Sequence, residues 1–363
     1  MSYTYFTSES VTDGHPDKIC DQIADTILDA ALAQDKMSKM AVEATIKDDF
    51  ILIYGEANTT ALIDYEGIAK AVLKSIGYTE NYTVMVRVNR QSPEIFNAVE
   101  RDDVSAGDQG IMFGYACDET ENYMPLPIDL AHQLAARLSE LKQSVSWIRP
   151  DGKTQVTVAY DEFNRPAFVK TIVISAQHDE SVSMEVLRET IIREVIEKVV
   201  DPSLLTPQSE FIINPSGKFT IGGSFGDSGT TGRKIVVDTY GGMGRIGGGC
   251  FSSKDPSKVD RSAAYYARYV AKNVVANQLA RRCELQLSYA IGLSHPLSIH
   301  IDTFGTGVIS DEEILERIKR NFNFSVSNII DELDLLQPIY HFTSNFGHFG
   351  REQFSWEQFK PMQ

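Results

Sequence analysis

A glycine-rich stretch followed by closely spaced lysines and acids is the part of the sequence best suited to chemistry. Residues 222–234 read GGSFGDSGTTGRK, and residues 241–261 read GGMGRIGGGCFSSKDPSKVDR. Glycines let backbone N–H groups approach an anion closely, and a helix predicted to follow would add free N–H groups and its positive dipole end. Lys254 and Lys258 add positive charge, while Asp260 supplies the hard oxygen that Mg²⁺ takes beside phosphate oxygens. Residues 227–261 therefore predict a site for a magnesium-bound polyphosphate, and so a nucleotide-using enzyme.

Two simpler explanations of these residues stay open at this point. Tight turns between strands would account for the glycines as well as an anion site does, and a solvated charge run would account for the lysines. The stretch is not a Walker A loop, because no G-K-[ST] follows the first glycine at the required spacing. The combination favours a site, since Lys254 and Lys258 adjoin both a glycine run and an acid.

A second candidate lies near the N-terminus, where Gly14-His15-Pro16-Asp17-Lys18 precedes a predicted helix. His15 could donate a hydrogen bond to a leaving oxygen, and Asp17 could hold a second metal. An acid at a helix start also complements the helix dipole, and for this segment alone that explanation is favoured. Glu43 and Glu56 lie on predicted strands, where a carboxylate is usually solvated unless it faces a pocket.

Composition limits the class of protein. The chain has 363 residues, of which 42% are hydrophobic and 23% charged, as expected for a soluble globular protein of two or three domains. Its formal net charge of −16 argues against nucleic acid and anionic membranes as partners. No apolar run approaches the ~20 residues of a membrane span and no signal peptide is recognisable, so the expected address is the cytoplasm. The four cysteines form no C-x-x-C pair, which favours reduced thiols over a zinc site.

The predicted elements mix helices and strands without the regular alternation of a doubly wound sheet, which indicates an α+β fold. Strand pairs followed by a helix occur at least twice, as in a repeated α+β unit. The polar segment 91–110 is predicted to be a mobile loop. Strands are predicted at 40–46, 50–56, 154–160, 167–176, 285–291 and 297–304. Helices are predicted at 17–34, 63–76, 130–141, 184–199 and 311–322, and after residues 255–257, with Asp255 as cap and Pro256 in the first turn.

Six segments together resemble one family. They are SESVTDGHPDK (8–18), GDQG (107–110), residues 226–234, residues 241–261, SYAIG (288–292) and GHFGRE (347–352). The sequence resembles the S-adenosylmethionine synthetase (methionine adenosyltransferase) family from residue 6 to residue 356. The resemblance implies a transferase that moves the adenosyl group of ATP to the sulfur of L-methionine and then hydrolyses the bound tripolyphosphate to phosphate and diphosphate. Such a displacement at C5′ needs no enzyme nucleophile, so catalysis must come from positioning and from stabilising charge on the leaving group.

The resemblance also implies an architecture and a set of partners. It implies three similar α+β domains with pseudo-threefold symmetry, here residues 1–98, 105–221 and 222–361. Family members form dimers whose subunits share the active sites, commonly as a dimer of dimers, so a homotetramer is expected. The implied cofactors are two Mg²⁺ ions per site and K⁺.

By the same resemblance, each group of site residues has an expected role. Asp17 and Asp260 would hold Mg²⁺, Glu43 would bind K⁺, and Phe219 and Ile291 would sandwich adenine. The expected catalytic residues are His15, Lys153, Arg233, Lys254 and Lys258. The expected methionine-binding residues are Glu56, Gln91, Asp108, Asp227 and Lys258. The expected ATP-binding residues are His15, Asp151, Lys153, Lys218, Phe219, Asp227, Arg233, Lys234, Cys250, Lys254 and Ile291.

The sequence departs from the usual family pattern in three places. The stretch 91–108 is a few residues shorter than in most bacterial members, Cys250 stands where alanine is common, and Ser253 where glycine is common. In the family the stretch 91–108 gates the site, so its shortening is expected to change loop kinetics and substrate affinity. The charged residues around Cys250 and Ser253 remain, so we expect these two changes to leave the chemistry intact. Two alternatives stay open: another ATP-dependent phosphotransferase, and a non-catalytic regulatory subunit of the same fold.

Overall fold

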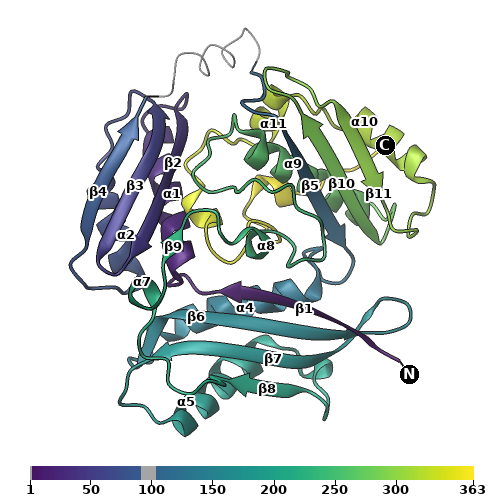
Figure 1. Ribbon diagram of the computed structural model, residues 1–363. Coiled ribbons are helices and arrows are strands. Elements are labelled where there is room, and N and C mark those ends of the chain that lie inside the picture. The colour runs from purple at the N-terminus through teal and green to yellow at the C-terminus, as the bar shows by residue number, and fades with distance from the viewer. Residues whose placement is uncertain (1, 91–103) are drawn as a thin grey trace.

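The structure, a computed structural model, describes residues 2–90 and 104–363, which form three small sheets around a central group of helices (Figure 1). Gln91, expected to bind methionine, and most of the predicted mobile loop lie outside the described residues. The described part of that loop, residues 104–109, has no regular secondary structure.

The first sheet has the strand order β4-β3-β2-β9. The hairpin of β2 (Lys39–Lys47) and β3 (Phe50–Asn58) is antiparallel, β4 (Thr83–Asn89) is parallel to β3, and β9 (Gly229–Thr230) pairs with β2. Along β2 every second residue is buried, which gives the period of two expected for a strand with one covered face. Helix α1 (Pro16–Leu32) packs on β2, and α2 (Tyr65–Ile76) packs on α1 and β4.

The second sheet has the order β1-β6-β7-β8 and the third the order β11-β10-β5. The second contains β1 (Thr4–Val11), β6 (Ile148–Tyr160), β7 (Pro166–His178) and β8 (Glu210–Ile213). Its helices are α4 (Leu126–Leu141), α5 (Met184–Ile191), a π-helical turn (Ile192–Ile196) and α6 (Glu197–Val199). The third contains β5 (Gly110–Cys117), β10 (Arg282–Tyr289) and β11 (Ser298–Asp302), with α9 (Val259–Ala276), α10 (Asp311–Asn321) and α11 (Val326–Glu332).

Short elements connect these units. They are α7 (Gly223–Gly226), α8 (Ile235–Asp238), and the 3₁₀ turns Pro202–Leu204, His341–Thr343 and Ser355–Glu357. No helix among residues 2–90 and 104–363 is both long and apolar enough to cross a membrane.

The same order of elements recurs in all three units: a helix, an antiparallel hairpin, then a second helix. The first unit runs α1-β2-β3-α2, the second α4-β6-β7-α5 and the third α9-β10-β11-α10. A parallel strand follows in the first two units, as β4 and β8. The predicted α+β fold of three similar domains is therefore confirmed.

Each sheet also takes one strand from a distant part of the chain. Strand β1, from the N-terminal stretch, pairs with β6; β5, from the middle of the chain, pairs with β10; and β9, from the later part, pairs with β2. The sheets therefore do not follow the predicted divisions at 98 and 222, because each predicted segment donates a strand to the next sheet in a cycle. The domain limits themselves stay a prediction.

Most of the predicted elements are present with shifts of a few residues, but the start of α9 was predicted wrongly. Helix α9 begins at Val259, with Lys258 as its N-cap residue. Asp255 does not cap it, because its carboxylate accepts hydrogen bonds from the Met40 N–H at 2.7 Å and the Ser257 N–H at 2.9 Å, and pairs with Lys258. The prediction also missed β1, β4, β5, β8 and α11, and it did not foresee the π-helical turn within 184–199.

Buried ion pairs link the helices at the centre. Arg268 and Glu357 are both fully buried, with Nη2 2.9 Å from Oε2, and Lys272 approaches the same carboxylate oxygen at 2.9 Å. Arg268 also donates to the carbonyl of Tyr115 at 2.8 Å. Glu357 thus neutralises two cations of α9 and attaches the C-terminal segment to it.

We expect Glu357→Gln to lower the free energy of unfolding by about 3–5 kcal/mol, because Arg268 and Lys272 would stay buried without their carboxylate. Urea unfolding followed by circular dichroism measures this. A matched control is Glu66→Gln, which removes a half-exposed partner of Lys70 and should cost less than ~1 kcal/mol. Equal stability losses in the two variants would contradict the role assigned to Glu357.

Candidate active site

The N-terminal end of α1 holds the first predicted site residues. Pro16 suits the first helical position, since it needs no backbone donor there, and His15 is the N-cap residue. The His15 Nδ1 accepts a hydrogen bond from the Asp17 N–H at 3.2 Å. Burial, and next the charge of Lys234, lower the pKa of His15 to about 3, so its imidazole is neutral at physiological pH. Because Nδ1 is an acceptor, the ring proton is on Nε2, which is left to donate to a ligand.

Residues 229–234 lie directly against this helix end. The carboxylate of Asp17 accepts from the Thr230 N–H at 3.0 Å, pairs with Lys234 and lies 3.7 Å from Arg233 Nε. Burial alone would raise the pKa of Asp17, but hydrogen bonds from Lys234 and Thr230 outweigh it and lower the pKa. A Cβ on Gly229 would lie 2.1 Å from the Pro16 carbonyl oxygen, so only glycine permits this approach. Two cations and an acid are thereby held beside His15.

A cavity of about 340 Å³ opens next to these residues, within the size range of small-ligand sites. It is lined by His15 and by residues of β6 and of the 214–227 segment. Asp151 of β6 is buried and accepts from the Gly223 N–H at 2.8 Å, and burial raises its pKa to about 6. The predicted site residues in its wall are His15, Asp151, Lys153, Phe219 and Asp227. These five, with Asp17, Arg233 and Lys234, are called the α1 group below.

A second group of charged residues surrounds the start of α9. Lys254 Nζ lies 2.6 Å from Asp260 Oδ2, and Lys258 pairs with Asp255. Burial raises the pKa of the Cys250 thiol, so it is not a reactive thiolate. This thiol lies within the electrostatic influence of Lys254, which lowers its pKa, and of Glu43, which raises it. Cys250, Lys254, Lys258 and Asp260 are called the α9 group.

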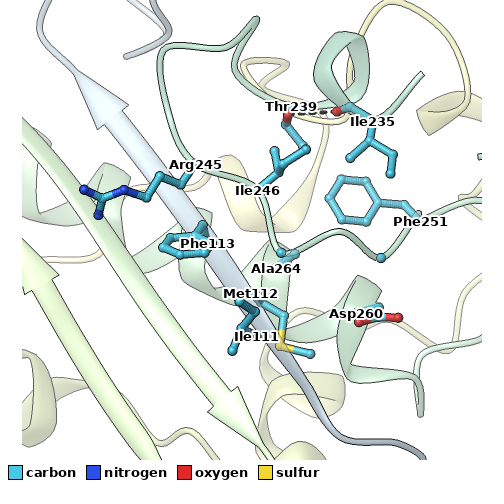
Figure 2. A pocket seen from close by; sticks show the side chains of 12 residues that line it. Ile111, Met112, Phe113, Ile235, Thr239, Arg245, Ile246, Phe251, Asp260 and Ala264 are labelled. Atoms are coloured by element: carbon cyan, nitrogen blue, oxygen red, sulfur yellow. Dashed lines mark hydrogen bonds between the residues drawn. The ribbon is translucent and has the colours of Figure 1, made fainter. Parts of the chain in front are cut away.

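A small cavity beside Asp260 is not a second substrate site. Figure 2 shows Asp260 near the apolar side chains of Ile111, Met112 and Phe251, which line this cavity. Its volume is about 20 Å³, enough for about one water molecule. The larger cavity at the α1 group is the candidate substrate site.

The two groups are connected through the first sheet and its added strand. Lys254 forms an isolated β-bridge with Ala41 of β2, two residues before Glu43. A Cβ on Gly232, two residues before Lys234, would lie 2.7 Å from the Cys250 sulfur. The chain segments that carry the two groups therefore contact one another.

The remaining predicted site residues are not among those that line the cavity. Lys218 and Glu56 are exposed, and Glu43 is half-buried on β2 with its carboxylate accepting from the Tyr54 hydroxyl at 3.2 Å. Ile291 follows β10, is 49% exposed and does not line the cavity that Phe219 lines. Asp108 is exposed beside the α9 group, since a Cβ on its neighbour Gly107 would lie 3.6 Å from the Ser257 carbonyl oxygen.

Sequence reasoning missed residues that hold the site together. Asp21, one helical turn after Asp17, accepts from the Gly232 N–H at 2.8 Å and pairs with the buried Lys18 at 3.0 Å. Asn214, in the left-handed conformation at φ 43°, lines the cavity. Asp21 could have been found from the sequence, because its four-residue spacing from Asp17 places both acids on one face of the helix.

A polyphosphate bound with its own metal ions fits this arrangement. Within the described parts of the chain no three His, Cys, Asp or Glu side chains form a metal-binding group. Single carboxylates such as Asp17 and Asp260 suit Mg²⁺, which usually binds one or two carboxylates together with substrate phosphates. The site therefore has the character of one that binds a polyphosphate together with Mg²⁺, as a nucleotide-using enzyme does.

Comparisons with known proteins agree with this class. Models of the S-adenosylmethionine synthetase N-terminal, central and C-terminal domains match residues 3–101, 103–219 and 221–358. An S-adenosylmethionine synthase of Sorangium cellulosum is 48% identical over 97% of this chain and 87% of its own length. Those of Treponema denticola and Staphylococcus epidermidis are 49% and 50% identical, over 98% and 95% of this chain and 95% and 92% of their own lengths. The chain belongs to the S-adenosylmethionine synthetase family, and the expected transferase of that family is confirmed.

We expect His15 to stay neutral, with its proton on Nε2, between pH 5 and pH 8, because its pKa is lowered to about 3. Proton–nitrogen correlation spectra of ¹⁵N-histidine-labelled protein report the ring tautomer, and His15→Asn identifies the signal. Since the lowered pKa is a folded-state property, the signal should titrate near pH 6.5 in urea. A folded-state midpoint between pH 5 and pH 7 would be incompatible with this site.

Proposed function

We propose that this chain makes S-adenosylmethionine in the cavity at the α1 group, by transferring the adenosyl group of ATP to the sulfur of L-methionine. The bound tripolyphosphate is then hydrolysed to phosphate and diphosphate. The observation that carries this proposal is that His15 and Lys153 line one cavity while Arg233 and Lys234 lie beside Asp17, two residues from His15, in a chain of net charge −16.

The displacement asks this site mainly to stabilise a leaving group. A sulfur lone pair forms the new bond to C5′, and the electron pair of the broken C5′–O bond passes to the triphosphate. The Nε2–H of His15 is available to donate to that oxygen, and Lys153, Arg233 and Lys234 to stabilise the growing charge. Fixed groups of this kind need no proton transfer and no enzyme nucleophile.

The proposed metal ligands are Asp17 and Asp260 for two Mg²⁺ ions and Glu43 for K⁺. Mg²⁺, when bound, neutralises phosphate charge and orients the leaving group. The Mg²⁺ assignment is supported by the position of both acids. Asp17 adjoins Lys234, and Asp260 adjoins Lys254, so each acid already lies beside a proposed phosphate-binding lysine. Glu43 lies on the strand that Lys254 bridges.

We further propose that two copies of the chain complete each site, as a dimer and, by pairing of dimers, a homotetramer. The support is that Phe219 lines the cavity, while its proposed adenine partner Ile291 follows a strand of a different sheet and remains half-exposed. Phe50 and Met85, on neighbouring strands of the first sheet, are also 39% and 43% exposed, as expected for a face covered in an oligomer.

The remaining ligand contacts follow the same assignment. Glu56, Asp108, Asp227 and Lys258 would address methionine, with Gln91 lying outside the described residues. Asp151, Lys218 and Cys250 would complete the ATP contacts.

Incubation of the purified chain with ATP, methionine, Mg²⁺ and K⁺ tests the reaction. We expect mass spectrometry to find S-adenosylmethionine together with phosphate and diphosphate, and the rate to fall when K⁺ is left out. ADP without S-adenosylmethionine would instead identify another phosphotransferase. ATP binding without turnover would identify a regulatory subunit.

We expect Lys254→Ala and Asp260→Asn each to lower turnover at least ~10²-fold, the scale of removing one charge-stabilising group from a transition state. Steady-state rates at saturating ATP and methionine measure this. Lys70→Ala, on the exposed face of α2, is the matched control and should keep the normal rate. Near-normal turnover in both site variants would refute the role of the α9 group.

A further inference from the structure

Each acid proposed for magnesium is paired with a lysine proposed for phosphate. Asp17 pairs with Lys234, and Asp260 Oδ2 lies 2.6 Å from Lys254 Nζ. The two pairs come from different elements, the first joining α1 to the segment after β9, the second joining α9 to the loop before it. The same arrangement therefore occurs twice, on separate parts of the fold.

The side chains of both pairs are largely buried, so separating one partner from the other costs free energy. The Asp17 side chain is 2% exposed and that of Lys234 16%, while Lys254 and Asp260 are 19% and 26% exposed. A charge that loses its partner in such a place keeps most of its desolvation penalty. Among the described residues, Asp17 would keep the Thr230 N–H at 3.0 Å and Arg233 at 3.7 Å as its remaining partners.

Separate arrival of either ligand is therefore unfavourable. If a metal-free triphosphate binds Lys234, the buried carboxylate of Asp17 loses its partner and lies beside the negative charge of the triphosphate. A bare Mg²⁺ that takes Asp17 leaves a shielded ammonium beside a dication. When both arrive together, the lysine moves to a phosphate oxygen and the carboxylate moves to the metal, so no charge is left unpaired.

We propose that the pairs Asp17–Lys234 and Asp260–Lys254 make this site specific for the magnesium complex of a triphosphate, by exchanging partners only when metal and phosphate bind together. The inference rests on the proposed function, because it takes the acids as magnesium ligands and the lysines as phosphate ligands. By linkage, metal and polyphosphate then raise each other's affinity by the same factor.

The exchange predicts that removing a proposed metal ligand strengthens the binding of metal-free polyphosphate. If the acids served only as metal ligands, removing one would leave metal-free binding of polyphosphate unchanged. If they hold the lysines, removing one frees a lysine for phosphate. Asp17→Asn and Asp260→Asn should therefore bind inorganic tripolyphosphate more tightly than the unaltered chain when the metal is chelated.

Calorimetric titration of the full chain with tripolyphosphate, in EDTA and in Mg²⁺, tests this. We expect at least ~10-fold tighter binding in EDTA for each variant, and a similar reduction in the gain from adding Mg²⁺. Asp227→Asn controls for the loss of a nearby negative charge, because Asp227 lines the cavity and its carboxylate accepts from the Ser228 N–H at 2.8 Å, with no lysine paired to it among residues 2–90 and 104–363. Asp48→Asn, in an exposed pair with Lys47, should change nothing.

The exchange would be overturned if the affinity for tripolyphosphate in EDTA rose no more in Asp17→Asn and Asp260→Asn than in Asp227→Asn. The converse measurement uses Mg²⁺ alone, which should bind Lys234→Met and Lys254→Met more tightly than the unaltered chain; unchanged Mg²⁺ affinity would also overturn it. If the buried Asp17 variant does not fold, the more exposed Asp260 pair carries the test.

These outcomes are separable from failure of the proposed function. A chain that makes S-adenosylmethionine but shows no tightening retains the function and loses the exchange. A chain that shows tightening but makes no S-adenosylmethionine retains the exchange as a property of a polyphosphate site with another reaction.

Discussion

None of the three sheets formed by the described residues is complete within one stretch of the chain, and this exchange of strands is the constraint on which the rest of the structure depends. Strand β1 completes the sheet of β6, β5 completes that of β10, and β9 completes that of β2. Each added strand satisfies backbone hydrogen-bonding groups that a sheet edge would leave open. Because the three donations close a cycle, each unit depends on the other two for its full set of partners.

The proposed chemistry lies where the chain crosses between sheets. His15 and Asp17 come directly after β1, Arg233 and Lys234 after β9, and Asp108 before β5. These segments pass close to one another: Gly229, at the start of β9, lies against the Pro16 carbonyl oxygen so tightly that a Cβ there would be 2.1 Å from it. Strand exchange therefore assembles the structure and also brings distant charged residues to one place.

Charge is arranged locally against an acidic whole. Lys234, Lys254 and Lys258 are each paired with an acid, and Asp21 and Asp255 accept hydrogen bonds from the backbone near these lysines. Deeper in the protein, Arg268 and Glu357 connect α9 to the C-terminal segment without exposure to solvent. Preorganisation of this kind lets a site stabilise charge without rearranging at the moment of reaction.

The sequence by itself determined the local elements with strong periodicity and the kind of chemistry. Apolar spacing predicted the helix at 17–34 and the hairpin at 40–56, and glycines beside Lys254 and Asp260 predicted a metal-bound polyphosphate. The order of motifs also predicted the family, which the comparisons confirmed.

Tertiary structure alone decided which segments pair and which charges meet. Strand β1 is largely polar and β9 has only two residues, so neither carries a periodic signal, and both are strands only because a distant edge pairs with them. The start of α9 was predicted wrongly because Asp255 is used by Met40, 215 residues away. Asp17 likewise meets Lys234, 217 residues later. Spacing along the chain predicts contacts within a helix or hairpin, whereas contacts at such separations are set by how the sheets close on one another.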